Sequence, residues 1–243
     1  MPYFDHFAAG RSTALGDWLT RRTVSEEFRF LRRHFAFTAL TRILEIGPGF
    51  GELAELFLAN GCRNYDIVEP NTAMRHRLRT RGVREAKEYA IPQLQEKDSS
   101  YDLIILSNVF EHLGGSAEAQ TFIAEAARVL SDGGMLFLLS PDYRDWGNDF
   151  FNCDFSHTNP TTVRRVTQML QNAGIEMVDY AYRYACFGGL PGWILSRAVK
   201  LTTSWTSGED TVSKAYKFRL TFLRRFMILG RNRRGDSAHS PRE

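Results

Sequence analysis

The most informative stretch of the chain reads Leu44-Glu-Ile-Gly47-Pro-Gly49-Phe-Gly51. It joins a predicted strand, Arg42–Ile46, to a predicted helix, Gly51–Asn60. Glycine at positions 47 and 49 allows a tight turn with close backbone approach to a ligand, and Gly51 allows the helix to pack closely on the strand. The turn alone predicts that a nucleotide-like molecule binds where the helix begins.

Two details separate this turn from the dinucleotide-binding turns of nicotinamide enzymes. Its Gly-x-Gly-x-Gly spacing is one residue tighter than Gly-x-Gly-x-x-Gly, and an acidic residue, Glu45, lies in the strand before the first glycine. A pyrophosphate needs an open helix N-terminus close by, whereas a compact sulfonium ligand has no phosphate to place there. The chain also lacks a recognisable Tyr-x-x-x-Lys catalytic pair, so a nicotinamide-dependent oxidoreductase is the weaker hypothesis.

Working outward from the turn, short β-branched runs alternate with helical stretches, which is typical of parallel βαβ units. The apolar run Asp102–Ser107 suits a strand that is buried on both faces. We therefore predict a doubly wound, Rossmann-like α/β fold, with a mostly parallel seven-stranded sheet and helices on both faces. The predicted strands are Arg42–Ile46, Tyr65–Glu69, part of Val83–Tyr89, Asp102–Ser107, Met135–Ser140, Ile175–Tyr184 and Phe226–Leu229. The predicted helices are Thr13–Thr20, Ser25–His34, Gly51–Asn60, Thr72–Arg81, Ala117–Leu130 and Thr161–Ala173.

Four blocks in this order resemble the class I S-adenosylmethionine-dependent methyltransferases, over the span from Thr41 to Tyr184. Besides the glycine turn, they are Glu69 after the second strand, Ser99–Leu113 around the fourth, and Ala126–Phe137 leading into the fifth. The resemblance implies S-adenosyl-L-methionine as cofactor, with Glu69 accepting hydrogen bonds from both ribose hydroxyls. The implied cofactor-binding residues are Glu45, Gly47, Gly49, Gly51, Glu69, Pro70, Asn108 and Val109.

The predicted third strand departs from the family pattern. No Asp appears there, and only Glu88 or Tyr89 is suggested as a contact for the adenine ring.

Candidate catalytic residues follow the fourth and fifth strands, at the carboxyl edge of the sheet where ligands of such folds bind. A hydroxyl acceptor must lose a proton, and His112 and His157 lie on these loops. We predict His157 as the base, with Asp154 of the segment Asp154-Phe-Ser-His157 fixing its tautomer. The alternatives are that Asp154 and His157 only tether the loop, and that Glu111-His112 only begins a helix.

The spacing of the cysteines and the lack of long apolar stretches indicate the cellular compartment. Cys62, Cys153 and Cys186 are widely separated and in no metal-ligand spacing, so we predict reduced thiols and no metal site. No stretch approaches the ~20 continuous apolar residues needed to span a bilayer. The segment Met1–Arg11 lacks the pattern of a secretory signal. We therefore expect a cytoplasmic protein.

Basic residues gather in one segment, although the net charge of the chain is only +3. Between Arg197 and Arg234 there are ten Lys or Arg residues against Glu209 and Asp210. Interleaving with aromatic residues over 193–225 predicts peripheral contact with an anionic membrane, at its inner face, near a lipid-linked or phosphorylated acceptor. A lid, a dimer interface with solvated charges, and a grip on nucleic acid are the alternatives.

The favoured function is methyl transfer from S-adenosylmethionine to a hydroxyl, or secondarily an amine, of a small-molecule, sugar or lipid-linked acceptor. The alternatives are a nucleic-acid methyltransferase and a non-catalytic Rossmann-like binding module. The strand tip Ser107-Asn-Val-Phe110 lacks the Asn/Asp-Pro-Pro-aromatic tetrad of amino-methylating nucleic-acid enzymes, which argues against that chemistry and leaves ribose and other base positions open. The expected organisation is a helical lid (1–40), the cofactor-binding core (41–185), a basic insertion (186–219), the final strand (220–230) and a disordered tail (231–243).

Overall fold

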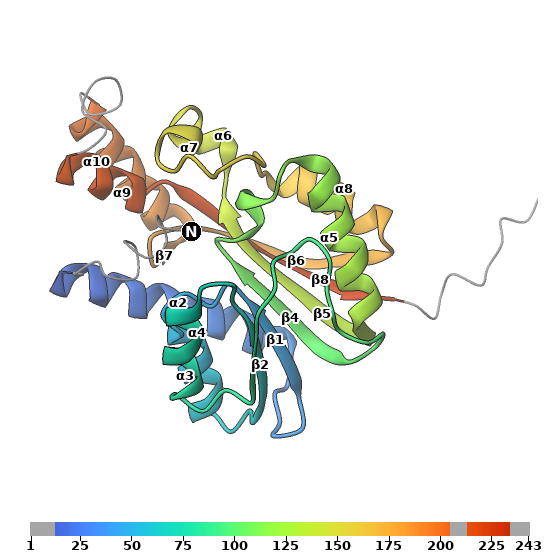
Figure 1. Ribbon diagram of the computed structural model, residues 1–243. Coiled ribbons are helices and arrows are strands. Elements are labelled where there is room, and N and C mark those ends of the chain that lie inside the picture. Colours follow the sequence, from blue (N-terminus) through green and yellow to red (C-terminus); the bar gives the residue numbers. More distant parts are fainter. Residues whose placement is uncertain (1–12, 205–212, 234–243) are drawn as a thin grey trace, which may run out of the picture.

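The computed structural model describes residues 13–204 and 213–233. Their central element is a sheet in the order β3-β2-β1-β4-β5-β8-β6-β7 (Figure 1). Strands β3, β2, β1, β4 and β5 run parallel, and β8 is inserted antiparallel between β5 and β6. The strands are β1 Arg42–Ile46, β2 Asn64–Val68, β3 Glu85–Lys87, β4 Tyr101–Ser107, β5 Leu130–Pro141, β6 Ile175–Tyr184, β7 Phe187–Gly188 and β8 Arg224–Asn232.

Helices cover both faces of the sheet, because its central strands are apolar on both sides. In β4, Leu103 and Ile105 pack with residues of α2 and α3, whereas Ile104 and Leu106 pack with residues of α5 and α8. The predicted doubly wound fold is thus confirmed. The helices are α2 Ala14–His34, α3 Glu52–Ala59, α4 Thr72–Arg79, the 3₁₀ helix η1 Phe110–His112, α5 Ser116–Val129, α6 Tyr143–Trp146, α7 Asp149–Asn152, α8 Val163–Asn172, α9 Gly189–Thr202 and α10 Lys214–Thr221.

Two predictions about elements are wrong. The sheet has eight strands rather than seven, because β7 adds two residues that pair with Arg183 and Tyr184 and are too few to give a sequence pattern. The two predicted N-terminal helices form one helix, α2, capped by the Thr13 hydroxyl. Ser25 does not begin a second helix there, since its hydroxyl donates to the Arg21 carbonyl within the same helix and no Gly or Pro interrupts the chain.

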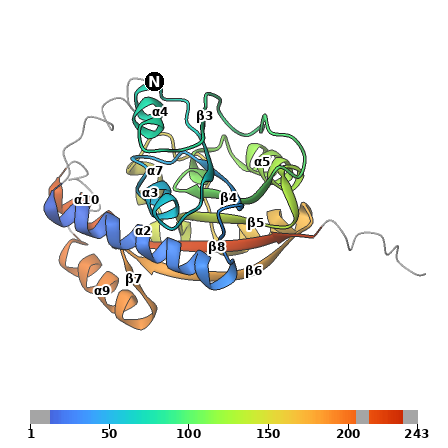
Figure 2. The same cartoon turned by 90° about the horizontal axis from the view of Figure 1, so that it is seen from below.

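The segment after β6 holds β7, α9 and α10, and residues 205–212 between the two helices lie outside the described residues. Figure 1 shows α6, α7, α9 and α10 gathered beyond one end of the sheet, and Figure 2 shows α9 at the periphery of the molecule. The predicted tail begins too early, because Arg231 and Asn232 belong to β8. The rest of that tail (234–243) and residues 1–12 of the predicted lid lie outside the described residues. In 13–204 and 213–233, no helix is both long and apolar enough to cross a membrane.

Candidate active site

The glycine turn between β1 and α3 uses its three glycines for different reasons. All three have positive φ angles, between 55° and 84°. A Cβ on Gly47 would lie 2.5 Å from Val109 Cγ2, and one on Gly51 would collide with Leu78. A Cβ on Gly49 would meet no atom within 4 Å. Gly47 and Gly51 therefore allow neighbouring side chains to pack closely against the turn, while Gly49 leaves space open for a ligand.

Glu45 lies beneath this turn and is only 2% exposed. The Tyr65 hydroxyl on β2 donates to its carboxyl oxygen Oε2 at 2.8 Å. Burial raises the pKa of Glu45 to about 8, and the Tyr65 hydrogen bond opposes this only in part. Glu45 therefore links β1 to β2, and its carboxyl group is largely protonated near neutral pH.

Glu69 directly follows β2, at the same edge of the sheet as the turn. Its Oε1 accepts the Asn71 backbone N–H at 2.7 Å, while its Oε2 has no hydrogen bond within the described part of the chain. Burial raises the pKa of Glu69, and the Asn71 N–H and the Arg75 charge oppose the rise. One carboxyl oxygen is thus held by the backbone, and the other is available to a ligand.

The two residues suggested for adenine are both engaged elsewhere. The Glu88 carboxylate forms an ion pair with Arg75. The Tyr89 hydroxyl is directed at the buried Glu96. Among the described residues, only the Oε2 of Glu88 is engaged and its side chain is 67% exposed, whereas Tyr89 is buried with its hydroxyl on Glu96.

The end of β4 adjoins the glycine turn. Asn108 has a φ of 55°, in the left-handed region, and its N–H donates to the Leu139 carbonyl at 2.9 Å. The next residue, Val109, is the one that packs over Gly47. This geometry turns the Asn108 side chain toward a cavity beyond the strand ends.

That cavity has a volume of about 500 Å³ and lies at the carboxyl ends of β4 and β5. It is bounded by α2, η1, the loop after α7, α10 and the start of β8. Its lining combines apolar groups with titratable ones: Gly16, Leu19, Thr20, Thr23, Val24, Glu27, Asn108, Glu111, His112, Pro141, Trp146, His157, Leu220, Thr221 and Arg225. Both predicted histidines thus line one cavity beside the predicted cofactor turn.

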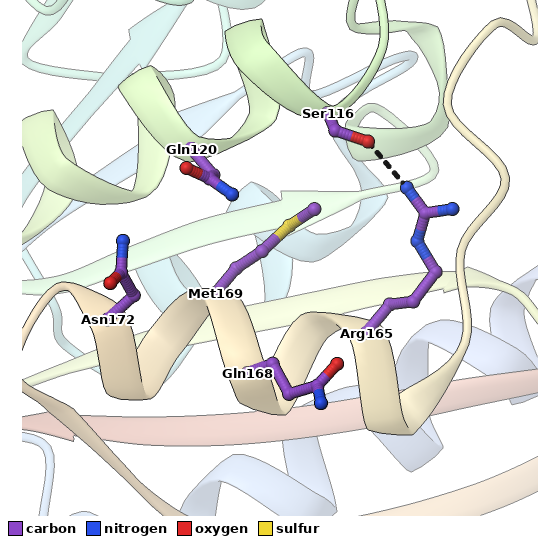
Figure 3. Close-up of a pocket in the computed structure, with 6 residues that line it drawn as sticks. All are labelled: Ser116, Gln120, Arg165, Gln168, Met169 and Asn172. Carbon is purple, nitrogen blue, oxygen red and sulfur yellow. Dashed lines mark hydrogen bonds between the residues drawn. The ribbon is translucent and has the colours of Figure 1, made fainter.

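A second hollow of about 450 Å³ lies between α5 and α8, away from the glycine turn (Figure 3). Arg165 there donates to the Ser116 hydroxyl at 2.7 Å. The other lining residues are Gln120, Gln168, Met169 and Asn172. None of its described lining residues carries a carboxylate, imidazole or thiol, so this hollow is a weaker place for acid–base chemistry.

Hydrogen bonds hold the loop after α7 against η1. The Glu111 carbonyl accepts the N–H groups of Thr158 and Asn159 at 3.1 and 3.0 Å. The His112 and His157 rings lie 4.7 Å apart as a result, inclined by 64°. Glu111 is buried, and the Ser140 hydroxyl donates to its Oε2 at 3.0 Å. Burial raises the pKa of Glu111 to about 7.

The partners of the two imidazoles fix their tautomers. His157 Nδ1 lies 2.8 Å from the Phe150 carbonyl, which can only accept. His112 Nδ1 lies 2.8 Å from the Ser156 hydroxyl, whose own proton is donated to Asp154 at 2.6 Å. Both Nδ1 atoms therefore carry the proton, and both Nε2 atoms carry a lone pair. Burial lowers the pKa of each histidine, which favours these neutral forms.

The predicted pairing of Asp154 with His157 is wrong. Asp154 acts on the other histidine, through Ser156, and the Phe150 carbonyl orients His157. The Asp-x-x-His spacing could not reveal this, because the short helix α7 returns the Phe150 backbone to the imidazole.

Two charged residues of the cavity were not predicted to lie there: Glu27 has no role in the sequence analysis, and Arg225 belongs to the basic segment predicted to contact a membrane. Glu27 of α2 is buried and accepts from the Ser107 hydroxyl at 2.7 Å, and burial raises its pKa. Arg225 at the start of β8 makes no ion pair within the described residues. Burial lowers the pKa of Arg225, and Glu27 and Glu111 oppose that shift. Neither residue belongs to a motif, so only their convergence in space identifies them.

Comparison with known proteins places this arrangement in a family. A family model described as a methyltransferase domain matches residues 14–180. No curated protein matches the chain. A SAM-dependent methyltransferase from Archaeoglobus fulgidus is similar in structure, with 17% identity, a TM-score of 0.59, and 86% of this chain and 94% of that chain covered.

Two further solved structures share the fold. The geranyl diphosphate C-methyltransferase from Streptomyces coelicolor A3(2), in complex with Mg²⁺, geranyl diphosphate and S-adenosyl-L-homocysteine, has 13% identity and a TM-score of 0.62, covering 86% of this chain and 77% of that one. The cyclase SpnF has 15% identity and a TM-score of 0.60, covering 87% and 81%. At these identities the likeness shows the fold alone.

Proposed function

The chain belongs to the S-adenosylmethionine-dependent methyltransferases, and from this premise we propose that it methylates a hydroxyl of a small acceptor bound in the 500 Å³ cavity. The observation that carries the proposal is the pair of neutral imidazoles, His112 and His157, on the wall of that cavity. An amine acceptor is the second choice.

The residues around the glycine turn fit the cofactor. Gly49 faces open space, and the Oε2 of Glu69 is available for the ribose hydroxyls. Asn108 and Val109 follow β4 beside the turn, where the methionine part of the cofactor would lie. The bound cofactor supplies an activated methyl group on a sulfonium sulfur. Glu45 contributes to this site by joining β1 to β2 beneath the turn rather than by contact with the cofactor.

The acceptor side of the site offers a base and a positively charged side chain. A hydroxyl placed in the cavity can pass its proton to an imidazole Nε2, because both Nδ1 atoms are already protonated. Arg225 lines the same cavity without an ion pair in the described part of the chain, which favours an acceptor that carries a carboxylate or phosphate group. The volume suits a small molecule or a single sugar rather than a nucleic-acid strand.

A panel of acceptors tests this proposal. Purified protein is incubated with S-adenosylmethionine and separate pools of hydroxylated acids, sugar phosphates, amines and oligonucleotides, and S-adenosylhomocysteine formation is measured. We expect turnover with anionic hydroxyl compounds and a raised KM in Arg225→Gln. Turnover with oligonucleotides alone would contradict the proposal.

The role of the imidazole is tested with the acceptor found. His157→Ala is expected to lower kcat by roughly 10²- to 10⁴-fold, the range for loss of a positioned base, with unchanged affinity for S-adenosylmethionine. His76→Ala, on the exposed side of α4, is the matched control and should keep full turnover. Full turnover of His157→Ala would reduce this residue to a structural one.

We further propose that α9 and α10 contact an anionic membrane surface. On α9, Leu190, Trp193, Ile194 and Leu201 share one helix face and are 44–77% exposed. Neither α9 nor α10 contains an Asp or Glu. The Arg197 guanidinium lies 5.6 Å from the centroid of the Trp193 ring, beside this apolar face.

The structure reduces the number of charges this surface can offer. Lys200 binds Asp145 and Arg219 binds Asp149, so these two cations are used inside the molecule. Arg197, Lys214 and Lys217 remain as the lipid-facing candidates. An apolar face flanked by cations is typical of helices that lie in the membrane interface.

Co-sedimentation with vesicles tests this surface. Wild-type protein is expected to bind phosphatidylserine-containing vesicles, with binding weakened by salt. Trp193→Ala combined with Ile194→Ala should lose it. Leu40→Ala removes an apolar side chain outside α9 that is 81% exposed, and this variant should bind normally. Binding that is equal in all three proteins would refute the proposal.

A further inference from the structure

We propose that Glu111, His112 and His157 form a binding site for one divalent transition-metal cation in the wall of the acceptor cavity. One ligand atom from each of the three side chains lies within 4.8 Å of the others. All three residues line the cavity, so a cation held there would keep positions open toward it. The cysteine-based sequence argument could not find this site, since it uses no cysteine.

The hydrogen bonds around the imidazoles leave only their Nε2 atoms for a metal. His157 donates its Nδ1 proton to the Phe150 carbonyl, and His112 donates its own to Ser156, which is fixed by Asp154. Metal-binding histidines characteristically donate their second ring N–H to a carbonyl or carboxylate, which orients the ring and raises its basicity. The ring orientations of both histidines are thus set by partners that would not compete for the cation.

The backbone brings the three ligands together without a cation. Glu111 and His112 are neighbours in η1. His157 is brought to them because Thr158 and Asn159 donate to the Glu111 carbonyl, and the Thr158 hydroxyl donates to the Leu113 carbonyl at 2.7 Å. The site is therefore largely preformed, and binding would need little rearrangement.

The donor set indicates the class of metal. Two imidazole nitrogens and one carboxylate suit Mn²⁺, Fe²⁺, Co²⁺ or Zn²⁺, whereas Ca²⁺ and Mg²⁺ prefer oxygen ligands alone.

A role for the cation in methyl transfer rests on the proposed function, whereas its binding does not. An acceptor hydroxyl coordinated to the cation would lose its proton to water more readily, because a bound cation lowers the pKa of a hydroxyl group. In the metal-loaded protein the imidazoles would bind the cation and water would accept the proton, whereas the role as base proposed above applies to the metal-free protein.

Titration of the chelator-treated full chain with Co²⁺ tests the site, with visible d–d absorption and calorimetry as readouts. We expect one equivalent to bind, and His112→Ala or His157→Ala to abolish saturable binding. Ser156→Ala keeps all three ligands and should weaken binding roughly 10- to 100-fold, as loss of an outer hydrogen-bond partner does. His76→Ala should bind as the wild type does, and thermal melting checks that each variant folds.

Absence of saturable Co²⁺ binding to the wild type, or unchanged binding in His157→Ala, would overturn the proposed site. Methyl transfer that persists after chelation, without Co²⁺ binding, would leave the proposed function intact and refute the metal site alone. Co²⁺ binding without turnover of any hydroxyl acceptor would refute the proposed function and keep the metal site.

Discussion

Glu45 belongs to the predicted cofactor motif, and its hydrogen-bond partner in the described structure is a residue of the neighbouring strand. Its carboxyl group is buried in β1 and bound to the Tyr65 hydroxyl on β2. Its raised pKa of about 8 means that the folded protein holds this proton far more tightly than the unfolded chain does. The stabilisation from this proton is complete below the unfolded pKa and is lost as the pH rises through 8.

This residue gives a pH-dependent prediction. Between pH 5 and 8, the free energy of unfolding of the wild type should fall relative to that of Glu45→Gln by up to about 1.4 kcal/mol per pH unit. The reason is that Gln mimics the protonated acid and cannot ionise. Urea unfolding at pH 6 and pH 9 measures the difference. Glu85→Gln, which removes an exposed carboxylate on β3, should follow the wild type. Parallel pH profiles for wild type and Glu45→Gln would contradict the burial argument.

At the residue scale, sequence reasoning located His112, His157 and Glu69 at one edge of the sheet. It did not predict their hydrogen-bond partners correctly. The pairing of Asp154 with His157 was expected from their spacing, yet the partner of His157 is the backbone carbonyl of Phe150. Backbone partners leave no trace in the side-chain pattern, which is why this contact could not be predicted.

The turn between β1 and α3 is the element on which the site depends. Gly51 begins α3 with a φ of 84° and lies against Leu78 of α4, whereas Gly49 faces open space. The same change at these two positions should therefore have different effects.

Gly51→Ala should destabilise the protein more than Gly49→Ala does. Both variants strain a left-handed backbone, at about 1–2 kcal/mol, and only the alanine at 51 must also displace a buried leucine, at a further ~1–3 kcal/mol. Gly49→Ala should instead mainly weaken S-adenosylmethionine binding, since its methyl group enters the open space. Thermal melts and ligand titration of both variants separate the effects, and the reverse order would contradict the assigned roles.

The sequence predicted some of the helices and strands accurately and others not. β1, β4 and β6 follow the predicted bounds closely, because long apolar or alternating runs specify strands. Two helices, Thr13–Thr20 and Ser25–His34, are predicted where α2 is continuous, and the Ser25 hydroxyl bonds within that one helix. The two-residue strand β7 depends on pairing with β6 and has no local signal of its own.

For the whole molecule, the acceptor cavity is assembled from distant parts of the chain. Glu27 on α2 and Arg225 on β8 meet around the strand ends that carry His112 and His157. The half of the candidate site that is proposed to bind the cofactor consists of motif residues, positioned mainly by one turn and two strand ends. The half proposed for the acceptor depends on tertiary packing of segments without motifs, so the sequence could indicate its location but not its composition.

The central claim is that this sheet edge binds S-adenosylmethionine, and calorimetric titration tests it most directly. We predict one equivalent of S-adenosylmethionine bound by the wild type, with no detectable binding of NADH. Loss of a charged hydrogen-bonding group costs about 1.5–3 kcal/mol, so Glu69→Ala should bind S-adenosylmethionine roughly 10- to 100-fold more weakly. Glu85→Gln, which removes an exposed carboxylate on β3, should bind it normally. Binding of NADH without S-adenosylmethionine would contradict the account.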